Sequence, residues 1–221
     1  MNLPTLVPHH IPESNRAQRI LEFWFGTSSK LATHPSDIDK SNIDGGTYRK
    51  AWFLKDDTFD EEIRQQFLTD VEQAAAGAFE GWQNAPQSAV ALLLLLDQFP
   101  RNLYRGSARS FSTDPQALKV AEYLVETGAD KSLPPAYRFF IYVPFEHSEA
   151  MAHQNRCVNL MQGLIESVPN LNEGFKNGLD YAIRHREVIE RFGRFPHRNK
   201  ALGRESTPAE IEFLKQPGSS F

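Results

Sequence analysis

Two short segments, far apart in the chain, repeat one series of residue types that suits anion binding. The first begins Phe-Pro-Arg-Asn-Leu at residue 99, and the second begins Phe-Pro-His-Arg-Asn at residue 195. Each continues through a glycine to a hydroxyl or carboxyl residue before proline, which is typical of a helix start. We call residues 99–115 the first Phe-Pro segment and residues 195–208 the second Phe-Pro segment.

The arginine and asparagine side chains in and around both segments form a predicted binding site. A guanidinium group binds a carboxylate or a phosphate through paired hydrogen bonds, and a carboxamide adds a neutral donor and acceptor. The alternative is that these arginines pair with carboxylates of their own chain, and Asp97 is a candidate for such a pair or for a base. The predicted ligand-binding residues are Asp97, Arg101, Asn102, Arg194, Arg198, Asn199 and Arg204.

The motif Glu-His-Ser-Glu at residues 146–149 supplies candidates for proton transfer. Because the ordinary pKa of histidine is about 6.5, His147 is suited to act as a general acid or base, oriented by one of the two glutamates. Pro144 predicts a break, so that a new helix begins with the motif and its N-terminal end favours anions. The alternative is a helix cap with a packed, polar His147. The predicted catalytic residues are His147, Glu149 and His197.

The sequence predicts neither a metal site nor a cofactor. It contains no His-Glu-x-x-His, no paired Glu-x-x-His and no second cysteine, so the usual ligand spacings are absent. The signatures of dinucleotide binding, of nucleotide hydrolysis and of a serine-hydrolase nucleophile are absent too. Cys157 lies in an apolar stripe, where a thiol is typically inert.

A local excess of positive charge stands on an acidic chain. The 221 residues carry a formal net charge of -4, whereas residues 184–204 hold seven Lys or Arg and two Glu. Binding of nucleic acid usually requires a broad positive surface. The charge pattern therefore favours a small anionic ligand or an acidic partner, and no nucleic acid is expected.

Composition also indicates the compartment. With 40% hydrophobic residues, the chain can bury a sizeable core, and its single cysteine fits a reducing environment. The N-terminus lacks the basic and apolar blocks of a secretory signal, and the longest apolar run, residues 89–96, is too short to span a bilayer. We therefore expect a cytoplasmic protein without a membrane partner.

The apolar spacing is helical over most of the chain and predicts an all-α fold. Side chains from Ile63 to Trp82 recur at steps of three and four, which predicts one long amphipathic helix. The run at residues 89–96 predicts a short, fully buried helix that begins at Pro86 and ends before Pro100. A buried strand is the alternative for that run.

Three more apolar stripes predict helices in the second half of the chain. One begins at Asp114 and ends at Gly128, and the others cover residues 151–165 and 175–192. Strands have little room, so we expect an array of helical hairpins with short loops.

This array is expected to form one all-helical domain over residues 1–221. The polar segment at residues 27–46 is longer than the other loops, which predicts either a lid over a ligand or a surface insertion. Thr207 and Glu210 form the pattern of a capping box with proline at the first helical position, which predicts the start of the last helix.

Three motifs follow one another along the chain. They are Asp-Gln-Phe-Pro-Arg-Asn at residues 97–102, Pro-Phe-Glu-His-Ser-Glu at 144–149 and Phe-Gly-Arg-Phe-Pro-His-Arg-Asn at 192–199. Together they resemble the signatures of a bacterial family, the domain of unknown function 924. The resemblance implies a helical superhelix similar to tetratricopeptide-repeat folds, and it implies no established reaction. The tetratricopeptide consensus itself is absent, which argues against a standard peptide-binding groove.

Two hypotheses about function follow. In the first, both Phe-Pro segments and His147 converge on a pocket for a small carboxylate or phosphate, and His147 or His197 moves a proton if the protein is an enzyme. In the second, a tetratricopeptide-like module presents a groove to an acidic peptide, and the segments brace the helices. A shared pocket of Arg101, His147 and Arg198 favours the first hypothesis, whereas burial of these residues in ion pairs argues against it. The sequence does not predict an oligomeric state.

Overall fold

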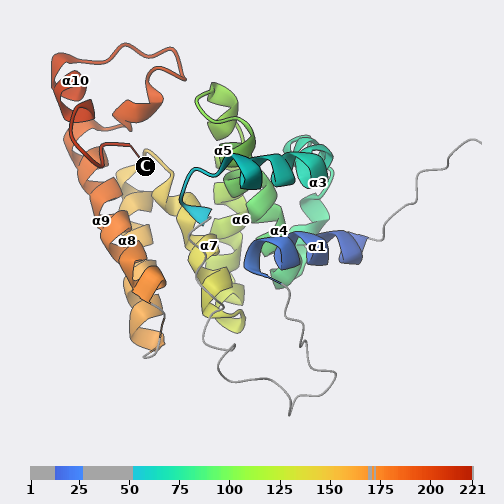
Figure 1. The fold of residues 1–221 in the computed structure, drawn as a ribbon. Coiled ribbons are helices and arrows are strands. Elements are labelled where there is room, and N and C mark those ends of the chain that lie inside the picture. Colours follow the sequence, from blue (N-terminus) through green and yellow to red (C-terminus); the bar gives the residue numbers. More distant parts are fainter. Residues whose placement is uncertain (1–12, 27–51, 169–170, 172, 221) are drawn as a thin grey trace, which may run out of the picture.

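The computed structural model describes residues 13–26, 52–168, 171 and 173–220, and this part of the chain contains helices and loops but no strand (Figure 1). The prediction of an all-α fold is confirmed. The segment predicted as a polar loop, residues 27–46, lies outside the described residues.

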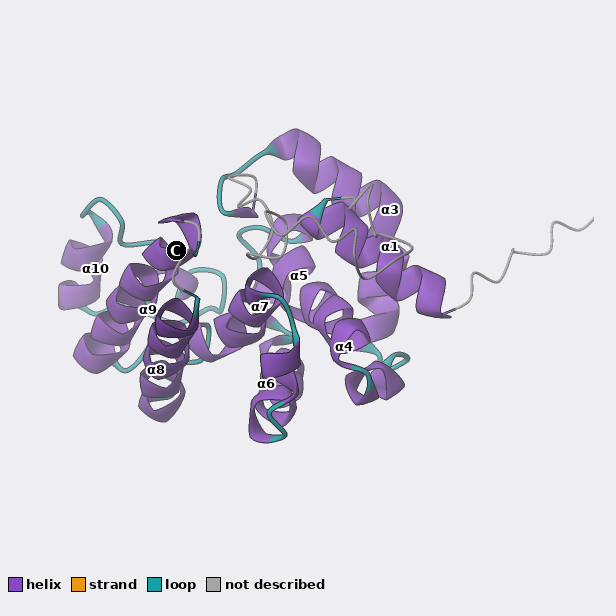
Figure 2. Cartoon of the chain, turned by 90° about the horizontal axis from the view of Figure 1, so that it is seen from below, coloured by secondary structure: helices purple, strands orange, loops and turns teal. Residues whose placement is uncertain are grey.

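The α-helices are, in chain order, α1 (Glu13–Phe25), α3 (Asp57–Ala75), α4 (Pro86–Leu93), α5 (Phe99–Leu103), α6 (Asp114–Glu126), α7 (Pro135–Glu146), α8 (Met151–Ser167), α9 (Glu173–Phe192) and α10 (Pro208–Leu214). Figure 2 shows them as a row that runs from α10, α9 and α8 to α4, α1 and α3. The consecutive helices α6, α7, α8 and α9 each pack against the next, as in helical hairpins with short connections. None of the described helices combines the length and the apolar character needed to cross a membrane.

One apolar core extends from α1 to α9. Trp24 of α1 lies at its centre, with its ring centroid 5.5 Å from those of both Phe99 and Phe140. A second, much smaller cluster contains Phe195 and the end of α9, and the ring of Phe213 packs against it. The first Phe-Pro segment therefore rests on the main core, whereas the second rests on the small cluster.

The helix expected between Ile63 and Trp82 is shorter than predicted. Its buried face is confirmed as far as Ala74, but α3 ends at Ala75. Gly77 has a φ of 85°, a left-handed conformation that glycine adopts without steric cost and that ends a helix. Trp82 consequently lies in a separate 3₁₀ turn.

The helix that begins at Pro86 was predicted to end before Pro100. It instead continues through Leu103. A π-helical turn at Leu94–Gln98 joins α4 to α5. Pro100 has no N–H to donate to the carbonyl four residues earlier, which is that of Leu96. The hydroxyl of Thr113 donates to this carbonyl instead, at 2.5 Å. A tertiary contact thus compensates for the proline.

Pro144 lies inside α7, so the prediction of a new helix at residue 146 is wrong. Because the proline is close to the helix end, it removes one hydrogen bond and leaves the rest of the helix intact. Glu146 ends α7, and the N–H of His147 donates to the carbonyl of Val143 at 3.1 Å. His147 therefore stands at the C-terminal end of a helix, where the helix dipole does not favour anions.

The remaining boundaries agree with the sequence. Asp114 begins α6, and Gly128, with a φ of 71°, follows its end. The capping box at the start of α10 is present, since the side chain of Thr207 accepts from the N–H of Glu210 and the carboxylate of Glu210 accepts from the N–H of Thr207.

Candidate functional site

The two Phe-Pro segments meet at one carboxylate, that of Asp114. Arg101 donates two hydrogen bonds to it, at 2.8 and 3.0 Å, and Arg198 donates a longer one at 3.3 Å. We call Asp97, Arg101, Asp114, His147 and Arg198 the ionic junction. The two segments therefore come together, and they do so on a carboxylate of their own chain. These ion pairs fit the alternative of internal pairing, so an anion site depends on the donors of Arg198 that they leave unused.

Asp97 and His147 form a hydrogen-bonded pair inside the ionic junction. Asp97, from the π-helical turn, places its Oδ1 atom 2.7 Å from Nδ1 of His147 and 3.3 Å from Nη1 of Arg101. Because a carboxylate accepts, Nδ1 carries the proton and Nε2 is left as the basic nitrogen. Nε2 has no hydrogen-bond partner within the described part of the chain.

Burial and neighbouring charges set the protonation of this pair. Burial alone would raise the pKa of Asp97, but Arg101 and His147 outweigh burial and lower it, so the carboxylate is ionised. Burial, aided by Arg101, lowers the pKa of His147 below its ordinary value, so the ring is neutral at neutral pH. Burial and the charge of Asp97 raise the pKa of Glu146 to about 8.

Arg198 is the least satisfied cation of the ionic junction. It is 6% exposed and stacks between the rings of Phe111 and Phe195, with its Cζ atom 4.6 and 4.5 Å from their centroids. Its Nε atom is buried and has no hydrogen-bond partner among the described residues. Burial, together with the charge of Arg101, lowers its pKa to about 10. Arg198 therefore retains a hydrogen-bond donor in a water-poor site.

Glu149 does not orient His147, contrary to prediction, because Asp97 does so. The Glu149 carboxylate instead accepts two hydrogen bonds from Arg204, at 2.8 and 3.0 Å, and one from the N–H of Phe195 at 2.7 Å. Burial would raise the pKa of Glu149, but these hydrogen bonds outweigh burial and lower it. Glu149 and Arg204 thus fasten the second Phe-Pro segment to the end of α7.

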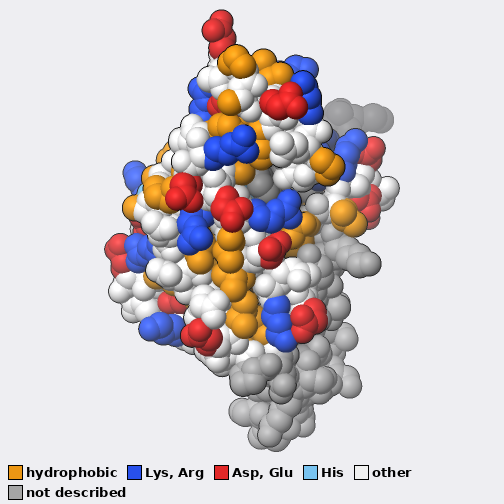
Figure 3. Space-filling view, turned by 90° about the vertical axis from the view of Figure 1, so that its left-hand side faces the viewer, with side chains coloured by type: hydrophobic (Ala, Val, Ile, Leu, Met, Phe, Trp, Pro, Cys, Tyr) orange, Lys and Arg blue, Asp and Glu red, His pale blue; other side chains and the backbone are white. Residues whose placement is uncertain are grey.

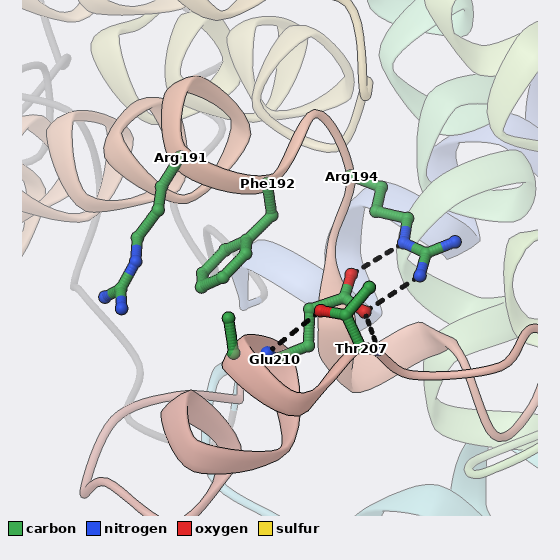
Figure 4. A pocket seen from close by; sticks show the side chains of 6 residues that line it. Arg191, Phe192, Arg194, Thr207 and Glu210 are labelled. Carbon is green, nitrogen blue, oxygen red and sulfur yellow. Dashed lines mark hydrogen bonds and ion pairs between the residues drawn. The ribbon is translucent and has the colours of Figure 1, made fainter.

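Asn102 and Arg194 lie outside the ionic junction. Asn102 donates to Asp60 of α3 at 2.7 Å. Arg194 donates to both carboxylate oxygens of Glu210 at 2.6 and 2.8 Å (Figure 4). These two predicted ligand-binding residues are therefore engaged in contacts that hold α3 and α10 in place.

Asn199 and His197 belong to the second Phe-Pro segment and are largely buried. Asn199 donates to the hydroxyl of Ser206 at 3.1 Å, and its Oδ1 atom is buried without a hydrogen-bond partner in the described part of the chain. Burial, and then the charge of Arg198, lower the pKa of His197 to about 3. His197 is consequently neutral and a weak base.

Two contributors to the candidate site were not predicted from the sequence. Asp114 was assigned only to a helix start, although it is the first acidic residue after the arginines of the first Phe-Pro segment. Gln154 of α8 is fully buried and donates to the carbonyls of Glu146 and Ser148 at 2.6 Å each, which holds the loop that carries His147. No local pattern distinguishes this glutamine.

Across residues 13–26, 52–168, 171 and 173–220, no three His, Cys, Asp or Glu side chains are grouped to hold a metal ion. Cys157 is buried in α8, and burial raises the pKa of its thiol well above the ordinary value. A thiol in that state is a poor nucleophile.

Comparison with known proteins places the chain in a family. The model of DUF924, described as a bacterial protein of unknown function, matches residues 20–218. The chain belongs to this family. A solved structure of a protein of unknown function from Agrobacterium tumefaciens is 36% identical, covers 91% of this chain and 98% of its own, and superposes with a TM-score of 0.72. No curated protein matches this DUF924 chain.

Proposed function

We propose that the protein binds a small carboxylate- or phosphate-bearing molecule at the ionic junction. The observation that carries this proposal is the buried guanidinium of Arg198, which has an unpartnered Nε–H and one long contact to Asp114. A buried donor without a partner costs about 1–3 kcal/mol. An anion that accepts from Arg198 removes that cost, so binding is favoured at this point.

The four cation and carboxylate groups of the junction have different roles in this proposal. Arg101 is held by Asp97 and Asp114, and it therefore fixes the geometry. Arg198 shares Asp114 with it and has hydrogen-bonding capacity left for a ligand. The ligand is therefore expected on the Arg198 side of Asp114.

His147 is the proposed proton-transfer group if the ligand is a substrate. Its ring is neutral, its Nδ1–H is held by Asp97, and its Nε2 is the free basic nitrogen. Once Nε2 takes a proton from the substrate, the adjacent ionised Asp97 stabilises the imidazolium. The pKa of about 3 makes His197 unsuited to this role near neutral pH.

A thermal-shift screen tests the proposal. Inorganic phosphate, di- and tricarboxylates and nucleoside monophosphates are added to the wild-type protein, to Arg198→Met and to the control Arg109→Met. Arg109 is suited as a control because its side chain is 56% exposed and pairs with Glu72 at the surface. A ligand that binds the native state raises its stability by about 2.7 kcal/mol at a hundredfold excess over Kd.

The expected result is an anion that raises the Tm of the wild type and of Arg109→Met but not that of Arg198→Met. Substitution His147→Asn is expected to preserve binding and to abolish turnover of that ligand. If no anion shifts the Tm, or if Arg198→Met responds like the wild type, the ionic junction is a structural network and the proposal is wrong.

The wider architecture is part of the same proposal. We propose that the row of hairpins is a tetratricopeptide-like superhelix within one domain and that the protein acts in the cytoplasm. The consecutive packing of α6 to α9 supports the superhelix, and the single, buried Cys157 suits a reducing compartment. Fold likeness by itself is a weak argument for function, so the assignment depends on the ionic junction.

A further inference from the structure

A groove runs along α9, and its lining residues are different from those of the ionic junction. It consists of a hollow of about 590 Å³ between α9 and α10 and a neighbouring hollow of about 350 Å³. The two hollows share Arg191 and Phe192. We call them together the α9 groove. Among its lining residues are Val188, Arg191, Phe192, Arg194, Glu210 and Phe213.

The floor of the α9 groove is aromatic. The rings of Phe192 and Phe213 have their centroids 5.0 Å apart, and Val188 is buried beside them. Both rings are half-buried, so part of each faces the groove. Figure 3, which views the side of the molecule that carries α8, α9 and α10, shows hydrophobic side chains bordered by charged ones. This surface can accept an apolar side chain.

Arg191 supplies a charge that no described carboxylate neutralises. Its guanidinium lies 4.7 Å from the centroid of Phe192 and 5.8 Å from that of Phe213, and it forms no ion pair with the described residues. In Figure 4, Arg191 extends from α9 on one side of Phe192. Arg194 lies on the other side, where Glu210 neutralises it. The available positive charge of the groove is thus next to its aromatic floor.

The charge balance favours an acidic occupant. Three arginines and two glutamates line the groove, which gives its lining a net charge of +1. Arg194 pairs with Glu210, and Arg184 lies 4.0 Å from Asp180 on its own helix, so Arg191 is the lining cation without an ion pair among the described residues. Residues 184–204 hold seven Lys or Arg and two Glu, in a chain whose net charge is -4. Oppositely charged surfaces attract and orient each other.

We infer that the α9 groove binds an acidic peptide segment, with an apolar side chain of the peptide over Phe192 and Phe213 and an adjoining carboxylate on Arg191. Arg191 keeps its charge, and the aromatic rings already restrict its side chain. Binding of a carboxylate therefore costs less side-chain entropy. This site and the proposed anion site share no lining residue. The inference therefore goes beyond the proposed function.

Fluorescence anisotropy tests the inference with a labelled peptide of eight glutamates around a central phenylalanine. Peptides with glutamine or lysine in place of glutamate are compared with it. Arg191→Gln removes the proposed contact. Arg186→Gln is the control, because it removes the same charge from another face of α9: five residues turn a helix by about 140°. We expect Arg191→Gln to weaken binding of the acidic peptide by about tenfold, as for loss of a charged hydrogen bond.

The control Arg186→Gln is expected to stay within a factor of about two, as is typical of an isolated surface charge. Arg198→Met, which tests the ionic junction, is expected to leave peptide binding unchanged, so that the two proposals fail separately. Equal binding of the glutamate and glutamine peptides overturns the inference, and so do equal effects of Arg191→Gln and Arg186→Gln. A concentration-dependent dimer that Arg191→Gln dissociates also overturns it, because the occupant is then a second copy of the chain.

Discussion

The two Phe-Pro segments contain the same residue types, but their arginines are paired to different extents. Arg101 donates two hydrogen bonds to Asp114 and one, at 2.8 Å, to the carbonyl of Asp97. Arg198 makes one contact to Asp114 at 3.3 Å and keeps an unpartnered Nε–H. The same residue types thus pair within the protein in the first copy and leave a donor for the proposed ligand in the second.

The packing around each copy explains the difference. The first Phe-Pro segment lies on α3, where Asp60 accepts from both Asn102 and Arg105. The second packs on the small apolar cluster, and of its buried polar atoms Oδ1 of Asn199 and Nε of Arg204 lack hydrogen-bond partners in the described part of the chain. Buried polar groups are normally paired, so this accumulation supports the proposed ligand site.

Removal of Asp114 is expected to have the largest effect on stability. Asp114→Asn leaves Arg101 and Arg198 buried close together without the shared negative charge. Breaking a buried ion pair by removing one partner costs about 3–5 kcal/mol. Urea denaturation measures this loss, and Asp180→Asn is the control, because that carboxylate is 72% exposed. A loss for Asp114→Asn no larger than the control's would contradict the central position of Asp114.

Substitution of each arginine by methionine tests the comparison directly. Arg101→Met leaves Asp97 and Asp114 with fewer partners and is expected to lower the free energy of unfolding by about 3 kcal/mol. Arg198→Met removes one long contact and one unpartnered donor, so a loss of about 1 kcal/mol or less is expected. Urea denaturation of both variants gives the order. If Arg198→Met costs more, the second Phe-Pro segment is the better paired copy.

His197 has no counterpart in the first segment and gives the comparison a pH dependence. Its pKa is about 3 in the folded protein, against about 6.5 when unfolded. Below pH 6.5 the unfolded chain binds a proton that the native state does not, so the group makes stability fall as the pH falls towards 3.

His197→Gln removes this dependence. Between pH 7 and pH 5 the wild type is expected to lose about 1–2 kcal/mol more than the variant. Urea denaturation at pH 5, 6 and 7 measures the difference. Parallel pH profiles of the two proteins would show that His197 is protonated normally in the folded state.

Thr207 takes the place of Asp114 before proline in the second segment, and its loss is expected to be the mildest. Thr207 caps α10 and bridges no arginine, so Thr207→Ala removes a cap worth about 1 kcal/mol. The midpoint of urea denaturation measures this effect. If Thr207→Ala lowers the free energy of unfolding as much as Asp114→Asn does, the two positions are structurally equivalent and the two segments do not differ here.

Local signals predicted much of the fold. Gly128, Thr207 and the apolar stripes were sufficient for helix boundaries because caps and periodicity depend on neighbours in the sequence. The helix ends predicted at Pro100 and Pro144 were wrong. Contacts that compensate for a proline, such as that of Thr113 with the carbonyl of Leu96, arise only in the packed structure.

The candidate site was predicted in its residue types but not in its pairings. Arg101, His147 and Arg198 do come together, and the predicted pairing of Asp97 with an arginine is confirmed by its contact with Arg101. The shared carboxylate of Asp114 and the hydrogen bond between Asp97 and His147 were not predicted. Asp97 and His147 are 50 positions apart in the sequence, so their hydrogen bond follows from the packing of α4, and of the π-helical turn that continues it, near α7 and from no local pattern.

The most direct measurement follows the Nε–H signals of Arg101 and Arg198 in ¹H–¹⁵N NMR spectra, assigned with Arg101→Lys and Arg198→Lys. The protein is titrated with inorganic phosphate and with the anion that gives the largest thermal shift. The account predicts that the Arg198 signal moves and saturates while the Arg101 signal stays in place. Movement of Arg101 alone, or no movement of either signal at saturating anion, would contradict the claim that the second Phe-Pro segment holds the ligand.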